Sequence, residues 1–263
     1  MHKPKYRIGL ALSGGSTRGV AHVGVLKALI ENDFEPQILS GTSAGSIVGT
    51  LYAAGKTPDE ILKFIKQSSL FRVFRPGFPF TGFSDLSYLH ERLESFIGED
   101  SFEALKKPIY IICTNLNTGE EVRFFKGSLF KKVVASCSVP LVFKPVEIDG
   151  ELYADGGIMN NLPSECLRKQ CELVIGSNVV PLRFKSSRSL GTVWGIAQRI
   201  FELAPSVNVR QSSRFCDVLI EPTDINQFNF FSLEKTDHLF QKGYEATIHQ
   251  IPYIKKLLES KLH

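Results

Sequence analysis

A G-x-S-x-G pentapeptide, Gly41-Thr42-Ser43-Ala44-Gly45, is the stretch of the sequence whose residue types are best suited to chemistry. It follows the apolar pair at 38–39 and leads into an apolar run. A strand that turns sharply into a helix through such a pentapeptide presents the serine hydroxyl on a strained corner, where it can attack a carbonyl. Ser43 is therefore the candidate nucleophile, with Gly41 and Gly45 as the small residues of the turn. The same pattern also occurs in turns without chemistry, so the interpretation depends on what surrounds it.

A glycine-rich run at 13–19, Ser-Gly-Gly-Ser-Thr-Arg-Gly, lies between the first predicted strand and the first predicted helix. Backbone N–H groups of such a turn, together with a helix N-terminus, converge on one space and stabilise negative charge. The charge could belong to a phosphate, but the run lacks the Lys-Ser/Thr ending of a P-loop, and the second strand does not end in an acidic residue. We therefore expect an oxyanion hole that faces Ser43 from the neighbouring strand. Its candidate residues are Gly14, Gly15, Ser16, Arg18 and Gly19.

A base that accepts the serine proton is the third requirement, and in a conventional hydrolase it is a histidine oriented by an acid. None of the six histidines has that setting: two are terminal and the others fall in helical patterns. Asp155 has the setting expected of a base, a position at the end of a predicted strand. It precedes Gly156 and Gly157, which permit close approach to another backbone. Asp155 is thus the candidate base, although an Asp-Gly turn without a chemical role would look the same.

The composition indicates a single globular domain that spans residues 1–263. The chain is 43% hydrophobic, which is enough to bury a large core. Its net charge of +4 is small and dispersed and does not favour nucleic acid as a partner. Five cysteines without a C-x-x-C pair indicate free thiols in a reducing compartment, hence a cytoplasmic protein. No stretch approaches the roughly 18 apolar residues of a membrane span, so contact with a bilayer would be peripheral.

Short apolar strands alternate with amphipathic helices along the chain, which predicts an α/β fold in which helices cover both faces of a mostly parallel sheet. Thr57 and Glu60 form a capping-box pattern, and Asp149-Gly150 is typical of a two-residue hairpin turn. The last predicted helix contains Pro252, where we expect an interruption. Strands are predicted at 7–12, 37–39, 108–114, 121–125, 144–148, 151–154, 173–179 and 218–220. Helices are predicted at 19–32, after Ser43, from Thr57 as N-cap through a body at 61–68, and at 86–97, 128–136, 192–203 and 237–263.

The stretch at 70–83 does not fit this alternation. It contains five phenylalanines with Arg72 and Arg75 between them, in a segment too rich in Pro and Gly to be regular. Clustered aromatic rings beside cations could form a flap over an apolar site or touch a membrane interface. The same rings could instead pack onto the domain.

Several of these motifs, in this order, resemble the patatin-like phospholipase family, and in particular its bacterial cytosolic branch, which is similar to the catalytic domain of neuropathy target esterase. The resemblance covers nearly the whole chain and implies a three-layer α/β/α patatin-like fold. Its motifs are 12–19 with 21–26, 41–45, 114–120, 135–140, 155–157 with 160–163, and 242–246. One departure is Ser16, which stands where the family usually has a third glycine. If this position needs a positive φ, the side chain adds strain or narrows the hole.

The resemblance implies a Ser–Asp dyad without a histidine. Ser43 would attack an ester carbonyl, and Asp155 would accept its proton and later activate the water that releases the acyl-enzyme. The N–H groups of Gly15 and Ser16 would form the oxyanion hole, and no metal or other cofactor would be required. The expected substrates are acyl esters of lipids, namely phospholipids or lysophospholipids.

Two alternatives remain open at the level of the sequence. One is a carboxylesterase that acts on short soluble esters, and the other is a lipid-binding regulatory protein that keeps the fold but turns over little. Labelling of Ser43 by a fluorophosphonate separates catalysis from binding, and the dependence of the rate on acyl-chain length separates the two enzymes. The headgroup, the acyl position cleaved and the oligomeric state do not follow from the sequence.

Overall fold

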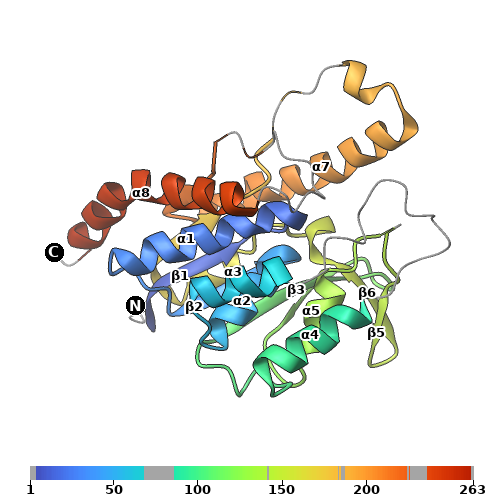
Figure 1. The fold of residues 1–263 in the computed structure, drawn as a ribbon, viewed down its shortest axis with the longest axis horizontal. Coiled ribbons are helices and arrows are strands. Elements are labelled where there is room, and N and C mark those ends of the chain that lie inside the picture. The colour runs from blue at the N-terminus through green and yellow to red at the C-terminus, as the bar shows by residue number, and fades with distance from the viewer. Residues whose placement is uncertain are drawn as a thin grey trace.

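A mostly parallel sheet of eight strands forms the centre of the molecule (Figure 1). Its strands are β1 (Tyr6–Leu12), β2 (Ile38–Thr42), β3 (Ile109–Asn115), β4 (Glu121–Phe124), β5 (Val146–Ile148), β6 (Glu151–Asp155), β7 (Cys171–Ser177) and β8 (Val218–Ile220). They follow the order β5-β6-β3-β2-β1-β7-β8, and β4 pairs with β3 off this path. The pairs from β3 through β2, β1 and β7 to β8 are parallel, whereas β3–β4, β3–β6 and β5–β6 are antiparallel. The mostly parallel sheet predicted from the sequence is thereby confirmed.

The computed structural model describes residues 4–67, 86–140, 142–182, 184, 187–223, 225 and 236–261. Its α-helices are α1 (Val20–Glu31), α2 (Ala44–Ala53), α3 (Pro58–Gln67), α4 (Ser87–Ile97), α5 (Phe130–Ser136), α6 (Glu165–Arg168), α7 (Val193–Ser212) and α8 (Thr236–Ser260). Short 3-10 helices are η1 (Ser16–Gly19), η3 (Gly156–Ile158), η4 (Ser187–Leu190) and η5 (Ser213–Phe215). The aromatic segment at 70–83, predicted to form a flap or to pack onto the domain, lies outside the described residues.

The side chains of β1 alternate between two apolar cores, one on each face of the sheet. Leu10 and Leu12 belong to the larger core, which α1, α2 and α8 cover, whereas Ala11 packs with Leu167 of α6 and Val209 of α7. Because helices cover both faces of this parallel strand, its side chains are buried on both sides, and its sequence is a continuous apolar run. The three-layer α/β/α fold is confirmed.

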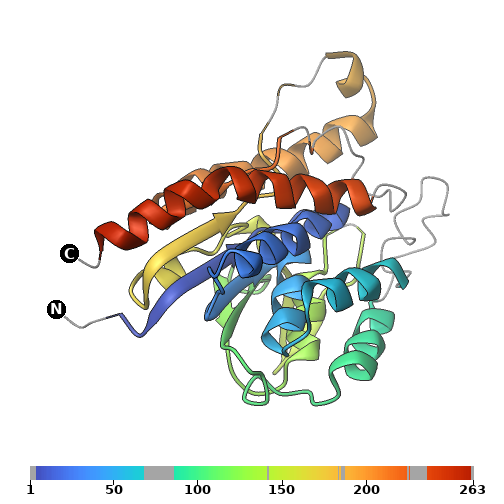
Figure 2. The ribbon, with the colours of Figure 1, turned by 60° about the vertical axis from the view of Figure 1, so that its left-hand side comes forward.

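Helices α1 and α8 lie side by side over one face of the sheet in both views of the ribbon (Figures 1 and 2). Two glycines make this close crossing possible. A Cβ atom on Gly24 would lie 2.0 Å from the Phe240 carbonyl oxygen, and one on Gly243 would lie 1.9 Å from the Ala21 carbonyl oxygen. The motif at 242–246 is thus part of a helix contact that holds α1, and with it the glycine run that precedes α1.

Two local signals read from the sequence form as predicted. In the capping box, the Thr57 N–H donates to the Glu60 carboxylate at 2.8 Å, and the Glu60 N–H donates to the Thr57 hydroxyl at 3.3 Å. In the hairpin between β5 and β6, Asp149 and Gly150 both adopt positive φ, 52° and 84°. This pair of conformations is that of a tight turn whose twist matches the flanking strands.

The prediction that Pro252 interrupts the last helix was wrong, because α8 continues through it to Ser260. Likewise α7 passes Pro205 and ends at Ser212, whereas the sequence predicted an end at Leu203. Proline removes one N–H donor and bends a helix, but packing on both sides can keep the helix going. In α8 the buried side chains of Leu239 and Ile254 lie on the two sides of the proline. The short helix α6 was not predicted. In the described part of the chain, no helix combines the length and the apolar character of a transmembrane segment.

Candidate active site

Ser43 occupies the corner between β2 and α2, with φ 52° and ψ −123°. A side chain rarely adopts such a backbone conformation, and strain of this kind persists where the surroundings enforce it. Here the close approach of the first turn of α2 enforces it. A Cβ atom on Gly41 would lie 2.6 Å from the Gly45 carbonyl oxygen, and one on Gly45 would lie 2.3 Å from the Leu12 carbonyl oxygen. The two glycines of the pentapeptide are therefore needed to form the strained corner.

Hydrogen bonds from two other serines hold the backbone of this corner. The Ser43 N–H donates to the Ser136 hydroxyl at 2.9 Å, and that hydroxyl donates to the Ile112 carbonyl at 2.6 Å. The Ser46 N–H and hydroxyl both donate to the Ser43 carbonyl, at 2.8 and 2.6 Å. Both backbone polar groups of Ser43 are thus satisfied, and its hydroxyl is left for other partners.

Asp155 ends β6 and places its carboxylate at the Ser43 side chain. Its N–H donates to the Ser138 carbonyl at 3.0 Å, and its carbonyl accepts from the Thr114 hydroxyl at 2.9 Å. The carboxylate accepts hydrogen bonds from the Gly157 N–H, at 2.7 Å, and from the side chain of Ser43. Burial raises the pKa of Asp155 to about 6, although these two hydrogen bonds oppose the increase. The group is thus largely ionised at neutral pH and yet more basic than an ordinary aspartate.

The glycine run after β1 lies directly against the elbow of Ser43. A Cβ atom on Gly14 would lie 3.2 Å from the Cβ of Ser43, and one on Gly19 would lie 2.5 Å from the Cβ of Ala44. Gly15 lies between β1 and η1, and Ser16 follows it with φ 51°. The positive φ at Ser16 is the condition under which a side chain replacing the usual glycine adds strain.

The N–H groups of the glycine run differ in what they bind. The Gly14 N–H donates to the Asn161 carbonyl, and the Arg18 N–H donates to the Gly15 carbonyl, both at 3.1 Å. Arg18 itself is buried. Among the residues that the structure describes, the N–H of Gly15 has no hydrogen-bond acceptor. Gly15, which follows the Gly14 that lies against Ser43, therefore keeps an unused donor, whereas the N–H groups of Gly14 and Arg18 are used within the fold.

His22, on α1, holds the start of the glycine run by a hydrogen bond. Its Nε2 donates to the Ser13 carbonyl at 2.8 Å, and its Nδ1 accepts from the Ser177 hydroxyl, also at 2.8 Å. Complete burial lowers the pKa of His22 to about 4, so the ring is neutral at physiological pH. The sequence did not predict this role, because a histidine within a helical pattern gives no indication that it contacts the glycine run.

Asn161 joins the loop that follows Asp155 to the glycine run. Its carbonyl accepts the Gly14 N–H, and its own N–H donates to the side chain of Asn208 on α7 at 2.9 Å. The Asn208 side chain in turn donates to the Gly157 carbonyl at 3.1 Å. Helix α7 therefore holds the loop that follows Asp155, a function for which the sequence contains no signal other than the family-like stretch at 160–163.

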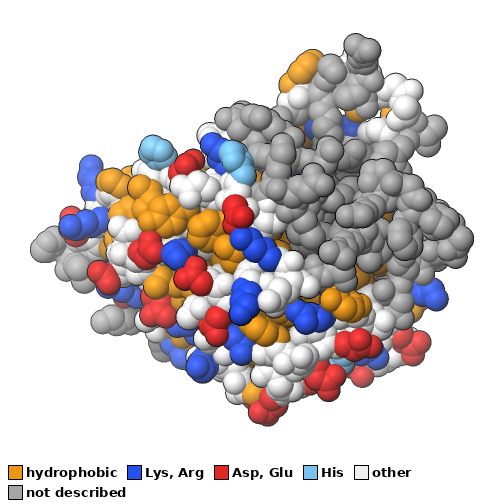
Figure 3. Space-filling model, viewed as in Figure 1, with side chains coloured by type: hydrophobic (Ala, Val, Ile, Leu, Met, Phe, Trp, Pro, Cys, Tyr) orange, Lys and Arg blue, Asp and Glu red, His pale blue; other side chains and the backbone are white. Residues whose placement is uncertain are grey.

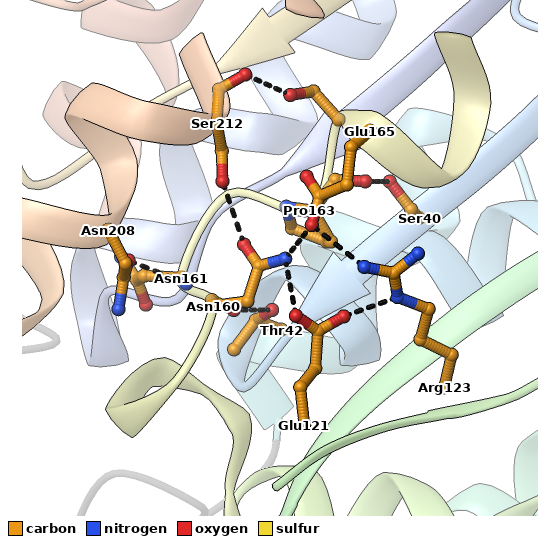
Figure 4. Close-up of polar contacts among 11 residues, drawn as sticks. Ser40, Thr42, Glu121, Arg123, Asn160, Asn161, Pro163, Glu165, Asn208 and Ser212 are labelled. Carbon is orange, nitrogen blue, oxygen red and sulfur yellow. Dashed lines mark hydrogen bonds and ion pairs between the residues drawn. The ribbon is translucent and has the colours of Figure 1, made fainter. Parts of the chain in front are cut away.

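Asn160 is the centre of a second set of polar contacts, shown in Figure 4. Its side-chain amide nitrogen donates to the carboxylates of Glu121 and Glu165, and its backbone carbonyl accepts from the Thr42 hydroxyl at 2.8 Å. Arg123 forms ion pairs with both carboxylates, and burial raises the pKa of Glu165. This cluster fixes the residue before Ser43 to the loop after Asp155. It therefore controls the spacing of the serine and the carboxylate.

A serine on a strained strand–helix turn, bonded to a buried carboxylate and facing a glycine loop, defines the class of sites that can form an acyl-enzyme. Residues 10–166, more than half of the chain, match the family described as patatin-like phospholipase, and the chain belongs to that family. The resemblance noted in the sequence is thereby confirmed.

Individual relatives agree with this assignment. The chain is 35% identical over 160 residues to an uncharacterized NTE family protein of Mycobacterium tuberculosis, covering 60% of this chain and 44% of that protein. It is 29% identical over 273 residues to human patatin-like phospholipase domain-containing protein 6, covering 90% of this chain and 20% of the human protein. The fold is similar to that of VipD from Legionella pneumophila, with a TM-score of 0.61 at 17% identity, over 98% of this chain and 67% of VipD. The chain thus spans less than half the length of these two sequence relatives.

Proposed function

We propose that this protein hydrolyses acyl ester bonds of lipids, namely phospholipids or lysophospholipids, through an acyl-enzyme on Ser43. The observation that carries the proposal is the hydrogen bond between Ser43 and the buried carboxylate of Asp155, whose pKa is about 6. Membership of the patatin-like phospholipase family supports a lipid as the substrate. The five free thiols support a reducing, cytoplasmic location.

In the first half of the reaction, the Ser43 oxygen forms a bond with the ester carbonyl carbon while Asp155 takes the hydroxyl proton. The tetrahedral intermediate collapses, the bond to the leaving alcohol breaks, and Asp155 returns the proton to that alcohol. In the second half, Asp155 takes a proton from water, whose oxygen attacks the acyl-enzyme. The carboxylic acid leaves, and Ser43 recovers its proton.

The oxyanion of both intermediates would be stabilised by the N–H groups of Gly15 and Ser16. The Gly15 N–H is the stronger of the two assignments, since it is unused within the described residues and Gly14 next to it lies against Ser43. A preorganised donor of this kind contributes about 3 to 4 kcal/mol to transition-state stabilisation. Neither the dyad nor this hole requires a metal ion.

The test compares hydrolysis of phospholipid and lysophospholipid vesicles or micelles with hydrolysis of a short soluble ester. We expect the lipids to be hydrolysed faster as the acyl chain lengthens, and Ser43→Ala and Asp155→Asn to lose activity while both remain folded. Matched controls are Ser260→Ala and Asp149→Asn, which change exposed residues remote from the dyad. A rate that is highest on short monomeric esters would favour a carboxylesterase. Lipid binding without turnover in the wild-type protein would favour a regulatory lipid-binding protein.

A further inference from the structure

Helix α7 carries an exposed apolar stripe. Ile196, Ile200, Leu203 and Val207 are 49, 58, 40 and 64% exposed. They follow one another at intervals of four, three and four residues, so they lie on one face of the helix. Single exposed apolar side chains are common on protein surfaces, but four in one row that cover nearly three turns indicate a binding surface.

The stripe begins in the part of α7 that stands away from the body of the molecule and runs towards the anchored end of the helix. In Figures 1 and 2 the first half of α7 and the preceding η4 project beyond the sheet and the other helices. The end of α7 is anchored, because Val209 is buried against the smaller core and Asn208 bonds to the loop after Asp155. The helix is therefore fixed at the active site and presents its apolar face outward.

The stretch of sequence that contains this helix is rich in positive charge. Residues 181–215 contain six Lys or Arg and one Glu, whereas the whole chain has a net charge of only +4. Arg210 and Arg214 are exposed near the end of α7. On the face shown in Figure 3, over α1 and α8, acidic and basic side chains are instead interspersed. An apolar helix face flanked by cations is complementary to the surface of a bilayer that contains anionic lipid.

The apolar stripe leads directly to the candidate active site. Val207 precedes Asn208, whose side chain donates to the carbonyl groups of Gly157 and Ile158. Ile158 and Met159, in the loop after Asp155, are themselves exposed. A bilayer that covered the stripe would therefore lie next to the loop that follows Asp155.

We propose that α7 docks this protein on the surface of bilayers that contain anionic phospholipid, with its apolar stripe in contact with the acyl chains and Arg210 and Arg214 near the phosphates. The choice of a bilayer over a protein partner rests on the proposed lipid substrate and on the positive charge. Docking through α7 orients the entrance of the site towards its substrate. Docking affects only one of two activities: hydrolysis of lipid in a bilayer depends on α7, whereas hydrolysis of a soluble ester does not.

Binding is tested without turnover by using the Ser43→Ala protein and sedimenting it with vesicles of phosphatidylcholine alone or of phosphatidylcholine with phosphatidylglycerol. We expect binding to the mixed vesicles, weakened by salt, and a loss of about tenfold or more in the partition coefficient when Ile200→Ser and Val207→Ser are combined. The matched control combines Ile248→Ser and Tyr253→Ser, two exposed apolar positions on α8, and should bind as before. In proteins with Ser43 intact, the α7 variant should keep its activity on a short soluble ester and lose activity on vesicles.

Three results would overturn the docking proposal: equal binding of the α7 variant and its control, equal binding to the neutral and anionic vesicles, or a concentration-dependent oligomer that the α7 variant abolishes. The last result would assign the stripe to a second copy of the chain. If the protein binds anionic vesicles through α7 but hydrolyses no ester, the docking surface stands and the proposed hydrolase function fails. If it hydrolyses lipid in vesicles and the α7 variant binds and hydrolyses those vesicles as well as its control does, the docking proposal fails and the proposed hydrolase function stands.

Discussion

Replacing Asp155 by asparagine should abolish activity and at the same time stabilise the protein at neutral pH. Asparagine has nearly the same shape, and its oxygen can still accept the hydrogen bond from the Gly157 N–H, but it removes a charge that burial disfavours. The pKa of Asp155 is raised from its ordinary value of 3.8 to about 6. By linkage, this change makes the ionised carboxylate cost about 3 kcal/mol of folding free energy above pH 7. Asp155→Asn should regain an amount of this order.

The sign of the pH dependence follows from the raised pKa. Between the unfolded and folded pKa values the native state binds more protons than the unfolded state, so the stability of the wild-type protein falls as the pH rises through this window. The stability difference between Asp155→Asn and the wild type should therefore be about half of its full value at pH 5 and complete above pH 7.

The assay is urea unfolding of both proteins at several pH values between 5 and 8, supported by thermal melting, in which 3 kcal/mol corresponds to roughly 6 °C or more. Asp149→Asn in the exposed β5–β6 turn is the control and should show no such pH-dependent gain. A stability difference that does not vary with pH, or an Asp155→Asn protein less stable than the wild type at pH 8, would show that burial does not make this carboxylate more basic.

Three further predictions test other parts of the site. The kcat/KM of the wild type on a soluble ester should rise with pH through about 6 and level off above 7, because in the proposed mechanism the ionised form of Asp155 is the base; a profile flat from pH 5 to 8 would contradict this. Ser16→Gly should raise the free energy of unfolding, measured in urea, by about 1 kcal/mol, since it relieves a side chain at φ 51°, and an unchanged or lower stability would show that Ser16 is not strained. Asn160→Ala should cost about 2 kcal/mol in the same measurement and lower kcat more than it raises KM, because it leaves the carboxylates of Glu121 and Glu165 without the amide between them; a change in KM alone would indicate that Asn160 does not position the dyad.

The sequence predicts best those features that depend on a few neighbouring residues. The glycines around Ser43 are required by atoms within the same turn or on the adjoining strand, so the elbow is visible as a pentapeptide. The capping box at Thr57 and the hairpin at Asp149 are equally local. Asp155 could be predicted from the sequence because the end of a strand followed by two glycines is a local pattern. Its partner Ser43 nevertheless lies more than 100 residues away in the chain.

Features that depend on tertiary packing were missed. Pro205 and Pro252 are breakers by local rules, and only the contacts on either side of them keep α7 and α8 continuous. The bracing of the glycine run by His22 and the contact of Asn160 with Glu121 join elements distant in the chain, and nothing in the sequence alone pairs them. The hydrogen bond from the Gly14 N–H to the Asn161 carbonyl also joins distant parts of the chain, and the sequence did not predict it.

The role of Ser43 as the nucleophile is tested directly by the site at which a fluorophosphonate reacts, determined by mass spectrometry of peptides from the labelled native protein. We expect one adduct on Ser43, none in Ser43→Ala, and slower labelling in Asp155→Asn than in Asp149→Asn. An adduct on another residue, or a folded native protein that does not react, would contradict the assignment of Ser43 as an acyl-accepting nucleophile.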